Sequence, residues 1–414
     1  ALALDPATEF YAFEYDPEWA ASDQQLAPLQ MPNQAGTYVF SNLAPETFHR
    51  LPSMLADHLP DRFGNALVDA WMQDRGVRTS DINALDRLTY AADRSMGALS
   101  FHPPVGSPPD EITAVQLADL VTAARSTLAG DLASAPEEAL HGLIEVGTSA
   151  GGARAKAVVA YNPTTGQIRT GQLDAAEGYE HWLIKLDGVG VDPTRENDRF
   201  GSGTGYGLIE FAYYLMASAA GVEMSECRLL PEGPRIHFMT RRFDRVGDGG
   251  RVHMQTLCGL AALDFNMAGA HSYAQYLDAI DQLGLGEAAR AQAFRRIVFN
   301  IAAVNRDDHT KNLSFLLPEQ GEWKLAPAYD ITHAHNPSGQ WTSLHQMTIE
   351  GKRANIVVDD LYRFADRFAV PGYKGIVSEV LEVVQGWPSF AAEVGLDKET
   401  TARVSNDLVA NRPA

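Results

Sequence analysis

The chain has 414 residues, of which 45% are hydrophobic and 21% are charged, and its formal net charge is −20. This length exceeds that of one ordinary hydrophobic core, so we expect two or three lobes with a cleft between them. The composition excludes a membrane protein, because no segment approaches the roughly 20 consecutive apolar residues of a spanning helix, and the negative charge disfavours broad binding to nucleic-acid phosphates.

The N-terminal segment and the cysteines predict a cytoplasmic protein. Residues 1–16 lack a basic start followed by an apolar run and a cleavage site, so no secretory signal is expected. Cys227 and Cys258 are too few for a disulfide framework, and neither has a neighbouring cysteine with which to bind zinc. We therefore expect reduced cysteines and no membrane association, and the acidic balance suits docking to a basic partner.

The first hundred residues predict a small α+β unit. Short alternating or aromatic stretches at residues 10–15 and 37–40 are typical of strands, and an apolar-periodic run follows at residues 48–72. Prolines then crowd residues 103–109, where neither a helix nor a central strand continues, because proline fixes φ and lacks an amide donor. We expect a first domain over residues 1–105.

A sheet-rich segment and then a helical segment follow. The expected strands lie at residues 157–161, 181–186 and 235–239. One helix, at about residues 207–220, interrupts them and carries Glu210 in its first turn. The later expected helices lie at residues 288–304, 359–368 and 373–384. This order predicts a bilobal α+β fold with a sheet-containing lobe over residues 110–244 and an all-helical lobe over residues 245–414.

The densest polar cluster lies at residues 305–315, directly after an apolar helix and directly before a short apolar strand. Asp307 and Asn312 are five residues apart, which is the interval between the catalytic aspartate and the metal-binding asparagine of the kinase catalytic loop H-R-D-x-x-x-x-N. Asp307 would accept the proton of a substrate hydroxyl, and Asn312 would hold magnesium. Lys311, between them, would neutralise charge that develops on the transferred phosphoryl group.

Other interpretations of this loop stay open. Aspartate, histidine and asparagine are also suited to capping a helix and shaping a turn. A zinc site is disfavoured, because His309 stands between carboxylates without a clear set of three or four ligands. The oxygen atoms that the loop offers suit magnesium better.

A second carboxylate follows the loop. Asp330 comes eighteen residues after Asn312, behind an expected strand at residues 323–325. Its position matches the aspartate of the kinase D-F-G motif, which binds the magnesium that bridges the β- and γ-phosphates. A tyrosine–aspartate turn after a strand is common, so Asp330 indicates a kinase only in combination with the loop around Asp307.

The phosphates of a nucleotide require a glycine-rich loop and a lysine. Residues 147–156 offer small residues whose backbone amides can approach phosphates closely, among them Ser149, Gly151 and Gly152. No Gly-Lys-Ser/Thr ends this segment, so it is not a Walker A motif. Lys185, on an apolar strand, fits the lysine that contacts the α- and β-phosphates, with Glu210 as its ion-pair partner.

Two alternatives concern the same region. The alternative interpretation of Lys185 is an ordinary exposed lysine of a strand. In that case Lys156 is the next candidate for contacting the phosphates. The glycines of residues 201–207 precede a helix as in a dinucleotide-binding fingerprint, but they follow no convincing parallel strand. We therefore interpret them as a connection and disfavour a dehydrogenase.

Five segments, spread from the first lobe to the last, resemble the HipA kinases. They are residues 51–61, 93–99, 149–156 and 242–245, and the pair formed by the loop around Asp307 with Tyr329 and Asp330. Each segment is short, but their order and spacing cover essentially the whole chain. The resemblance implies a protein-kinase-like fold in which an N-terminal lobe with an extra small subdomain and an all-helical C-terminal lobe hold ATP between them.

The resemblance also assigns roles to residues. It implies Asp307 as the catalytic base, Asn312 and Asp330 as magnesium ligands, Lys185 as the ATP lysine, and His309 among the nucleotide-binding residues. Arg241 and Phe243 fall where the hinge of the family meets adenine, although the family usually has an acidic residue in place of Arg241. Asp308 is an alternative base, but it stands only four residues before Asn312, which favours Asp307.

The activity that the resemblance implies is that of an ATP- and Mg²⁺-dependent serine/threonine kinase toxin. Such toxins phosphorylate a translation protein such as an aminoacyl-tRNA synthetase, favour persistence, and are restrained by a HipB-like DNA-binding antitoxin, which alone contacts DNA. Ser149 stands where such kinases autophosphorylate as an off-switch, with Thr148 as the adjacent alternative. The other possibility is an ATP-binding but inactive regulatory subunit of an antitoxin–operator complex. Family members also normally have a strand before the equivalent of residues 1–4.

Overall fold

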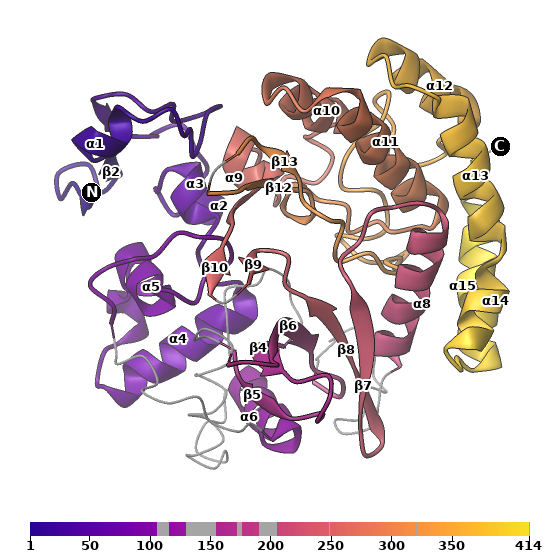
Figure 1. Ribbon diagram of the computed structural model, residues 1–414, viewed down its shortest axis with the longest axis horizontal. Helices are drawn as coiled ribbons and strands as arrows, with labels where there is room; N and C mark the ends of the chain where they lie inside the picture. Colours follow the sequence, from indigo (N-terminus) through magenta and orange to yellow (C-terminus); the bar gives the residue numbers. More distant parts are fainter. Residues whose placement is uncertain are drawn as a thin grey trace. The chain divides into compact units, whose positions relative to one another are not determined.

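The structure is a computed structural model that describes residues 1–105, 116–129, 155–171, 176–189, 205–247, 249–319 and 321–413 (Figure 1). The chain divides into two compact units, each assembled from separate stretches of sequence. The helical unit comprises Ala1–Asp57, Ile209–Met224 and His253–Ala414, and the sheet unit comprises His58–Leu208 and Ser225–Val252. The three consecutive domains expected from the sequence stay a prediction.

The sheet unit contains a five-stranded antiparallel sheet with the order β5-β4-β6-β8-β7. Its strands are β4 (Lys156–Tyr161), β5 (Ile168–Thr170), β6 (Glu180–Lys185), β7 (Cys227–Glu232) and β8 (Arg235–Arg241). The three strands expected from the sequence are therefore β4, β6 and β8. Val159 and Trp182 oppose each other on β4 and β6 and are fully buried, as β-branched and aromatic residues on a packed sheet face should be.

Helices complete the core of the sheet unit. They are α4 (Arg62–Asp74), α5 (Ala84–Ala91) and α6 (Leu117–Ala129), with a 3-10 helix η1 (Thr79–Asp81). Asp61 caps α4 by accepting a hydrogen bond from the backbone N–H of Gly64. Leu67 of α4 and Val121 of α6 are buried in the same apolar cluster as Trp182. Each such side chain contributes about 1.5–3 kcal/mol when it leaves water.

The N-terminal part of the helical unit is a small α+β region over Ala1–Asp57, which is shorter than the hundred-residue unit expected from the sequence. Strands β1 (Leu2–Leu4), β2 (Tyr11–Glu14) and β3 (Thr37–Tyr38) form an antiparallel sheet, and the short helices α1 (Pro17–Ala20), α2 (Pro45–Phe48) and α3 (Ser53–Ala56) accompany it. Ser53 Oγ donates to the carbonyl of Gly259 at 2.7 Å, which anchors α3 to α9 (Leu257–Ala261).

The rest of the helical unit is mainly α-helical. Its helices are α8 (Tyr206–Ala219, whose first residues belong to the sheet unit), α9, α10 (Tyr273–Gln282), α11 (Gly286–Ala302), α12 (Val358–Arg367), α13 (Tyr373–Gln385), α14 (Trp387–Glu393) and α15 (Lys398–Ala410). The expected helices correspond to α8, α11, α12 and α13. Among the described residues, no helix combines the length and apolarity that crossing a membrane requires.

The structure has short strands after residue 245, in the segment that was expected to be all-helical. Strands β11 (His253–Thr256), β12 (Ser314–Leu317) and β13 (Lys324–Leu325) form a three-stranded antiparallel sheet in the helical unit, and β9 (Arg245–Val246) pairs with β10 (Gly250–Arg251) in the sheet unit. The sequence indicated the strand that follows the polar loop and the strand at residues 323–325, which correspond to β12 and β13. The other strands have two to four residues, so their periodicity is too short to stand out.

Candidate functional site

The polar loop of the helical unit joins the end of α11 to β12. The chain leaves α11 through Val304, whose φ of 53° lies in the left-handed region. This conformation is strained for a β-branched residue and persists only where the surroundings impose it. Asn305 holds the turn, since its N–H donates to the carbonyl of Asn300 at 2.9 Å and its Nδ2 donates to Asn300 Oδ1 at 3.0 Å.

The two adjacent aspartates of the loop have different surroundings. Asp308 is buried, and its carboxylate accepts hydrogen bonds from the Tyr273 hydroxyl at 2.6 Å and the Gln346 N–H at 2.7 Å, and contacts His345 Nδ1 at 2.8 Å. Burial alone would raise the pKa of Asp308, but His345 and the hydrogen-bond donors hold it below its ordinary value. Asp308 thus anchors the loop, whereas the side chain of Asp307 is 44% exposed.

Asn312 closes the loop on Asp307. Its Nδ2 donates to the backbone carbonyl of Asp307 at 2.8 Å, at the end of the 3-10 helix η3 (Thr310–Asn312). The amide nitrogen is the donor of this bond, so Oδ1 is the atom of the side chain that suits a metal. His309 Nε2 lies 3.7 Å from Asp307 Oδ1, and the His309 ring packs on Phe265. The structure therefore brings Asp307, His309 and Asn312 together.

Lys311 lies beside an acidic group that the sequence analysis did not assign. Its ammonium group lies 4.7 Å from the centroid of the Phe265 ring. Asp57 is partly buried and accepts hydrogen bonds from Thr256 N–H and Oγ1, both at 2.7 Å. Burial raises the pKa of Asp57, and the nearby charge of Lys311 opposes that rise. The one sequence signal for Asp57 was its place in the segment 51–61 that resembles the HipA kinases.

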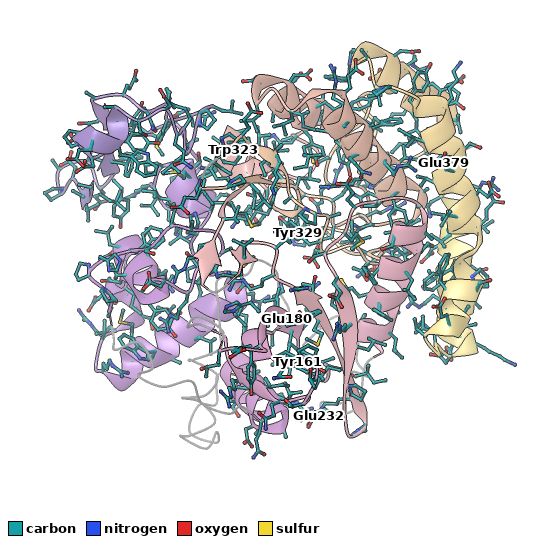
Figure 2. All side chains as sticks on the ribbon, in the orientation of Figure 1. Tyr161, Glu180, Glu232, Trp323, Tyr329 and Glu379 are labelled. Carbon is teal, nitrogen blue, oxygen red and sulfur yellow. The ribbon has the colours of Figure 1, made fainter. Side chains whose placement is uncertain are left out.

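Asp330 is held by its neighbours in an unusual backbone conformation. Its φ is 56°, a left-handed value that aspartate tolerates better than most residues do. Tyr329, labelled in Figure 2, precedes Asp330. Its hydroxyl donates to the carbonyl of Lys311 at 2.6 Å and also contacts Ser314 Oγ. On the other side, the N–H of Ala328 donates to the carbonyl of Glu223 at 2.8 Å. Tyr329 thus ties the Asp330 segment to the loop that carries Asp307 and Asn312.

The expected ATP-binding residues on the sheet lie in the sheet unit. Lys185, at the end of β6, stands opposite Lys156 of β4 and has its Nζ 5.7 Å from the Phe238 ring centroid. Lys185 is partly buried, and Lys156 is only 4% exposed. Arg241, at the end of β8, lies 3.1 Å from Glu180 and 3.7 Å from Glu226. Two acidic side chains therefore lie close to Arg241. The position itself carries an arginine where the resemblance led us to expect an acidic residue.

Phe243 lies in a turn that buried charges hold in place. Asp244 contacts Arg242 Nη2 at 2.6 Å and Arg245 Nη1 at 2.8 Å, and accepts a hydrogen bond from Gly97 N–H at 2.7 Å. Burial would raise the pKa of Asp244, but the two guanidinium groups hold it well below its ordinary value. Two of the segments that resemble HipA kinases, residues 93–99 and 242–245, are therefore in direct contact.

The remaining expected site residues are Glu210 and those of the phosphate loop. Glu210 is buried in α8, in the second turn instead of the first, because the helix begins at Tyr206. It belongs to the helical unit and Lys185 to the sheet unit, so their ion pair stays a prediction. Ser149, Gly151 and Gly152, with Thr148, lie outside the described residues.

Comparisons with known proteins bear on the whole chain. A family model described as the HipA N-terminal domain matches residues 1–102, and one described as the HipA-like C-terminal domain matches residues 148–387. A Sinorhizobium fredii protein named "Putative kinase Y4dM" is 28% identical over 166 residues, which are 36% of this chain and 36% of that protein. The chain thus matches about a third of the length of this curated relative.

Two solved structures resemble this chain to different extents. HipA of Shewanella oneidensis MR-1, in a complex with HipB and its operator DNA, has a TM-score of 0.69 at 18% identity, covering 99% of this chain and 93% of that one. The Helicobacter pylori proinflammatory kinase CtkA has a TM-score of 0.40 at 14% identity, covering 57% of this chain and 86% of that one. The HipA likeness confirms the predicted kinase-like fold. Since the two family models together span residues 1–102 and 148–387, this chain belongs to the HipA family.

Proposed function

We propose that the protein is an ATP- and magnesium-dependent serine/threonine protein kinase that acts as the toxin of a toxin–antitoxin pair. The observation that carries this proposal is the difference in burial and hydrogen bonding between two adjacent aspartates. Asp308 is buried and bound on both carboxylate oxygens, whereas Asp307 keeps a partly exposed carboxylate five residues before Asn312. A loop built only to cap a helix has no need of a second, exposed carboxylate held in place by a buried one.

The metal donors fit magnesium. Asn312 Oδ1 and the Asp330 carboxylate are hard oxygen donors, and Tyr329 joins the segments on which they lie. Bound magnesium would supply neutralisation of the charge on the β- and γ-phosphates. Lys311 adds a cation next to Asn312, and its position on the Phe265 ring keeps it within the loop.

Asp307 acts on the substrate hydroxyl in this mechanism. Its carboxylate accepts the hydroxyl proton while the hydroxyl oxygen forms a bond to the γ-phosphorus and the bond from that phosphorus to the departing ADP oxygen breaks. His309, whose Nε2 lies 3.7 Å from Asp307 Oδ1, is a nucleotide-binding residue in this proposal. Lys185 contacts the phosphates with Glu210 as its partner, Arg241 and Phe243 meet the adenine, and Ser149, Gly151 and Gly152 form the phosphate loop.

The biological context follows the family. The likeness to a HipA protein that was solved with HipB and operator DNA supports a HipB-like antitoxin as partner, with DNA reached only through it. We extend the proposal to a cytoplasmic location, to a translation protein such as an aminoacyl-tRNA synthetase as substrate, and to autophosphorylation of Ser149 as the off-switch. A phosphate of about −1.5 to −2 charges in that loop would compete with the phosphates of ATP.

Incubation with radiolabelled ATP and magnesium tests the proposal. The wild type should transfer label to itself or to an added protein, and Asp307→Asn and Asp330→Asn should not. Asp359→Asn removes an exposed carboxylate at the start of α12 and should retain the activity. Mass spectrometry should place the self-phosphate on Ser149. A wild type that binds ATP but transfers nothing, with and without its antitoxin, would make the chain an inactive regulatory subunit instead.

A further inference from the structure

The helical unit contains a second polar cluster, formed by the segment that follows Asp330 and by α15. His333 and His335 follow Asp330 by three and five residues, and Asp407 projects from α15. His333 Nε2 lies 3.0 Å from Asp407 Oδ2, and His335 Nδ1 lies 3.2 Å from Asp407 Oδ1. One ligand atom from each of the three residues lies within 4.8 Å of the other two.

These spacings suit a tetrahedral metal ion. Zinc bonds to nitrogen and oxygen of about 2.0–2.1 Å place neighbouring ligand atoms about 3.3 Å apart. The two histidine-to-carboxylate distances, 3.0 and 3.2 Å, are close to that value, although they run to different oxygens of Asp407. One oxygen of Asp407 and the two nitrogens lie within 4.8 Å of one another. Two imidazoles and one carboxylate are a common zinc set, whereas magnesium prefers oxygen donors in an octahedral arrangement.

The alternative is a pair of simple histidine–carboxylate contacts. His335 Nδ1 argues against it, because this buried nitrogen makes no hydrogen bond among the described residues although Asp407 Oδ1 is only 3.2 Å away. His333 Nε2 makes a hydrogen-bond contact with Asp407 Oδ2, whereas His335 Nδ1 lies beside the same carboxylate without one, as a metal ligand would. The side chains of His333 and His335 are 4% and 10% exposed, and that of Asp407 is 26% exposed. Solvent at the Asp407 side is therefore available for a fourth ligand.

The cluster is connected to the catalytic loop by backbone hydrogen bonds. Ala334, between the two histidines, donates to the carbonyl of Val304 at 3.2 Å and accepts from the N–H of Arg306 at 3.1 Å. Arg306 Nη2 in turn donates to Asn411 Oδ1 at 2.6 Å, just beyond α15. An ion that joins the histidines to α15 would therefore hold the residues that precede Asp307.

We propose that His333 Nε2, His335 Nδ1 and the Asp407 carboxylate bind a zinc ion, with water as the fourth ligand, and that this ion braces the catalytic loop from α15. The site is separate from the magnesium donors Asn312 and Asp330. It rests on the cluster itself and stands whether or not the chain is a kinase.

Metal titration of the full chain tests the site. Chelator-treated protein in excess magnesium chloride is titrated with zinc chloride by calorimetry and with cobalt chloride by visible absorption. The wild type should bind one equivalent of each and show the intense visible bands of tetrahedral cobalt. His335→Gln and Asp407→Asn should lower zinc affinity by about 100-fold or more, since even outer-sphere changes cost up to that much, and should lose the bands.

Three further variants test whether the metal signals come from this site. Asp330→Asn removes the proposed magnesium donor and His102→Gln removes an exposed histidine of the sheet unit, and both should keep the cobalt bands. His335→Cys should restore binding and add a thiolate-to-cobalt charge-transfer band in the near ultraviolet. Zinc should raise the Tm of the wild type and of His335→Cys but not of His335→Gln. A wild type without saturable zinc binding would overturn the proposal, and so would zinc binding by His335→Gln and Asp407→Asn that is as tight as that of the wild type.

Discussion

The two units each contain a buried aspartate that holds a functional turn, and the two carboxylates are stabilised in different ways. Asp244, in the sheet unit, lies within 2.8 Å of the guanidinium groups of Arg242 and Arg245. Asp308, in the helical unit, depends on hydrogen bonds from a tyrosine hydroxyl and a backbone N–H, and on one histidine. Two guanidinium groups compensate the first carboxylate, and one histidine with two neutral donors compensates the second.

The comparison also concerns distance along the chain. The two arginines of Asp244 lie within two residues of it, whereas the partners of Asp308 lie 35 to 38 residues away on both sides. The turn around Phe243 also needs residues 93–99, because Gly97 N–H donates to Asp244 across 147 residues. The loop around Asp307 depends on α10 and on the segment near His345. The partners of the anchor Asp308 thus come entirely from tertiary structure, whereas Asp244 combines local and distant partners.

The largest effect should follow from removing the carboxylate in the sheet unit. Asp244→Ala leaves two arginines without their buried partner, so we expect a loss of about 3–5 kcal/mol in the free energy of unfolding. Urea unfolding followed by circular dichroism measures this loss. Asp93→Ala removes a half-exposed carboxylate that lies 3.5 Å from Arg251 and should cost less than about 1 kcal/mol. Equal losses in the two variants would contradict the role assigned to Asp244.

Acid should weaken the sheet unit through His181. Burial, with the charges of Arg242 and Arg245, lowers the pKa of His181 from 6.5 to about 4. The folded state then binds fewer protons than the unfolded state, so this stabilisation is complete above about pH 6.5 and is lost as the pH falls toward 4. The loss amounts to up to about 3 kcal/mol.

The His181→Asn variant isolates this effect. We expect its free energy of unfolding to change less than that of the wild type between pH 7 and pH 4.5, so that the two profiles converge in acid. Other titrating groups act on both proteins and cancel in the difference. Parallel profiles over that range would show that His181 does not carry the acid sensitivity.

A smaller loss is expected in the helical unit. Asp308→Asn keeps the shape of the side chain but replaces one acceptor oxygen by a donor, which then meets other donors. We expect a loss of about 1–3 kcal/mol in the free energy of unfolding, together with weaker phosphoryl transfer. Thermal unfolding against Asp359→Asn as an exposed control measures the first quantity. Wild-type stability in Asp308→Asn would mean that the loop does not depend on this anchor.

The smallest effect on stability should come from the neighbouring residue. Asp307→Asn changes a partly exposed carboxylate, so the free energy of unfolding should stay within about 0.5 kcal/mol of the wild type. Phosphoryl transfer should nevertheless fall by about 100- to 10,000-fold, since the general base is lost. Initial rates with radiolabelled ATP, measured beside unfolding curves, test both statements. If Asp307→Asn lost stability but kept its rate, the roles of the two aspartates would be reversed.

Local patterns in the sequence predicted most of the elements that position the site. The strands β4, β6 and β8 and the helices α8, α11, α12 and α13 were expected from periodicity, because apolar spacing is repeated along consecutive residues. The start of α8 was placed one residue too late, so Glu210 was counted in the first turn instead of the second; the first turn carries no acidic residue that marks it. Strands β12 and β13, of four and two residues, are too short for such a signal to define their edges.

By itself, the sequence determined the candidate loop and its spacing, since Asp307, Asn312 and Asp330 lie on one short stretch of chain whose intervals are read directly. Only the tertiary structure decided which neighbouring aspartate is the anchor, because burial and hydrogen bonding distinguish two chemically identical side chains. It also decided that Asp57 meets Thr256 across 199 residues, and that Asp407 meets His333 across 74. Such contacts depend on packing between distant segments, which no local pattern of residues encodes.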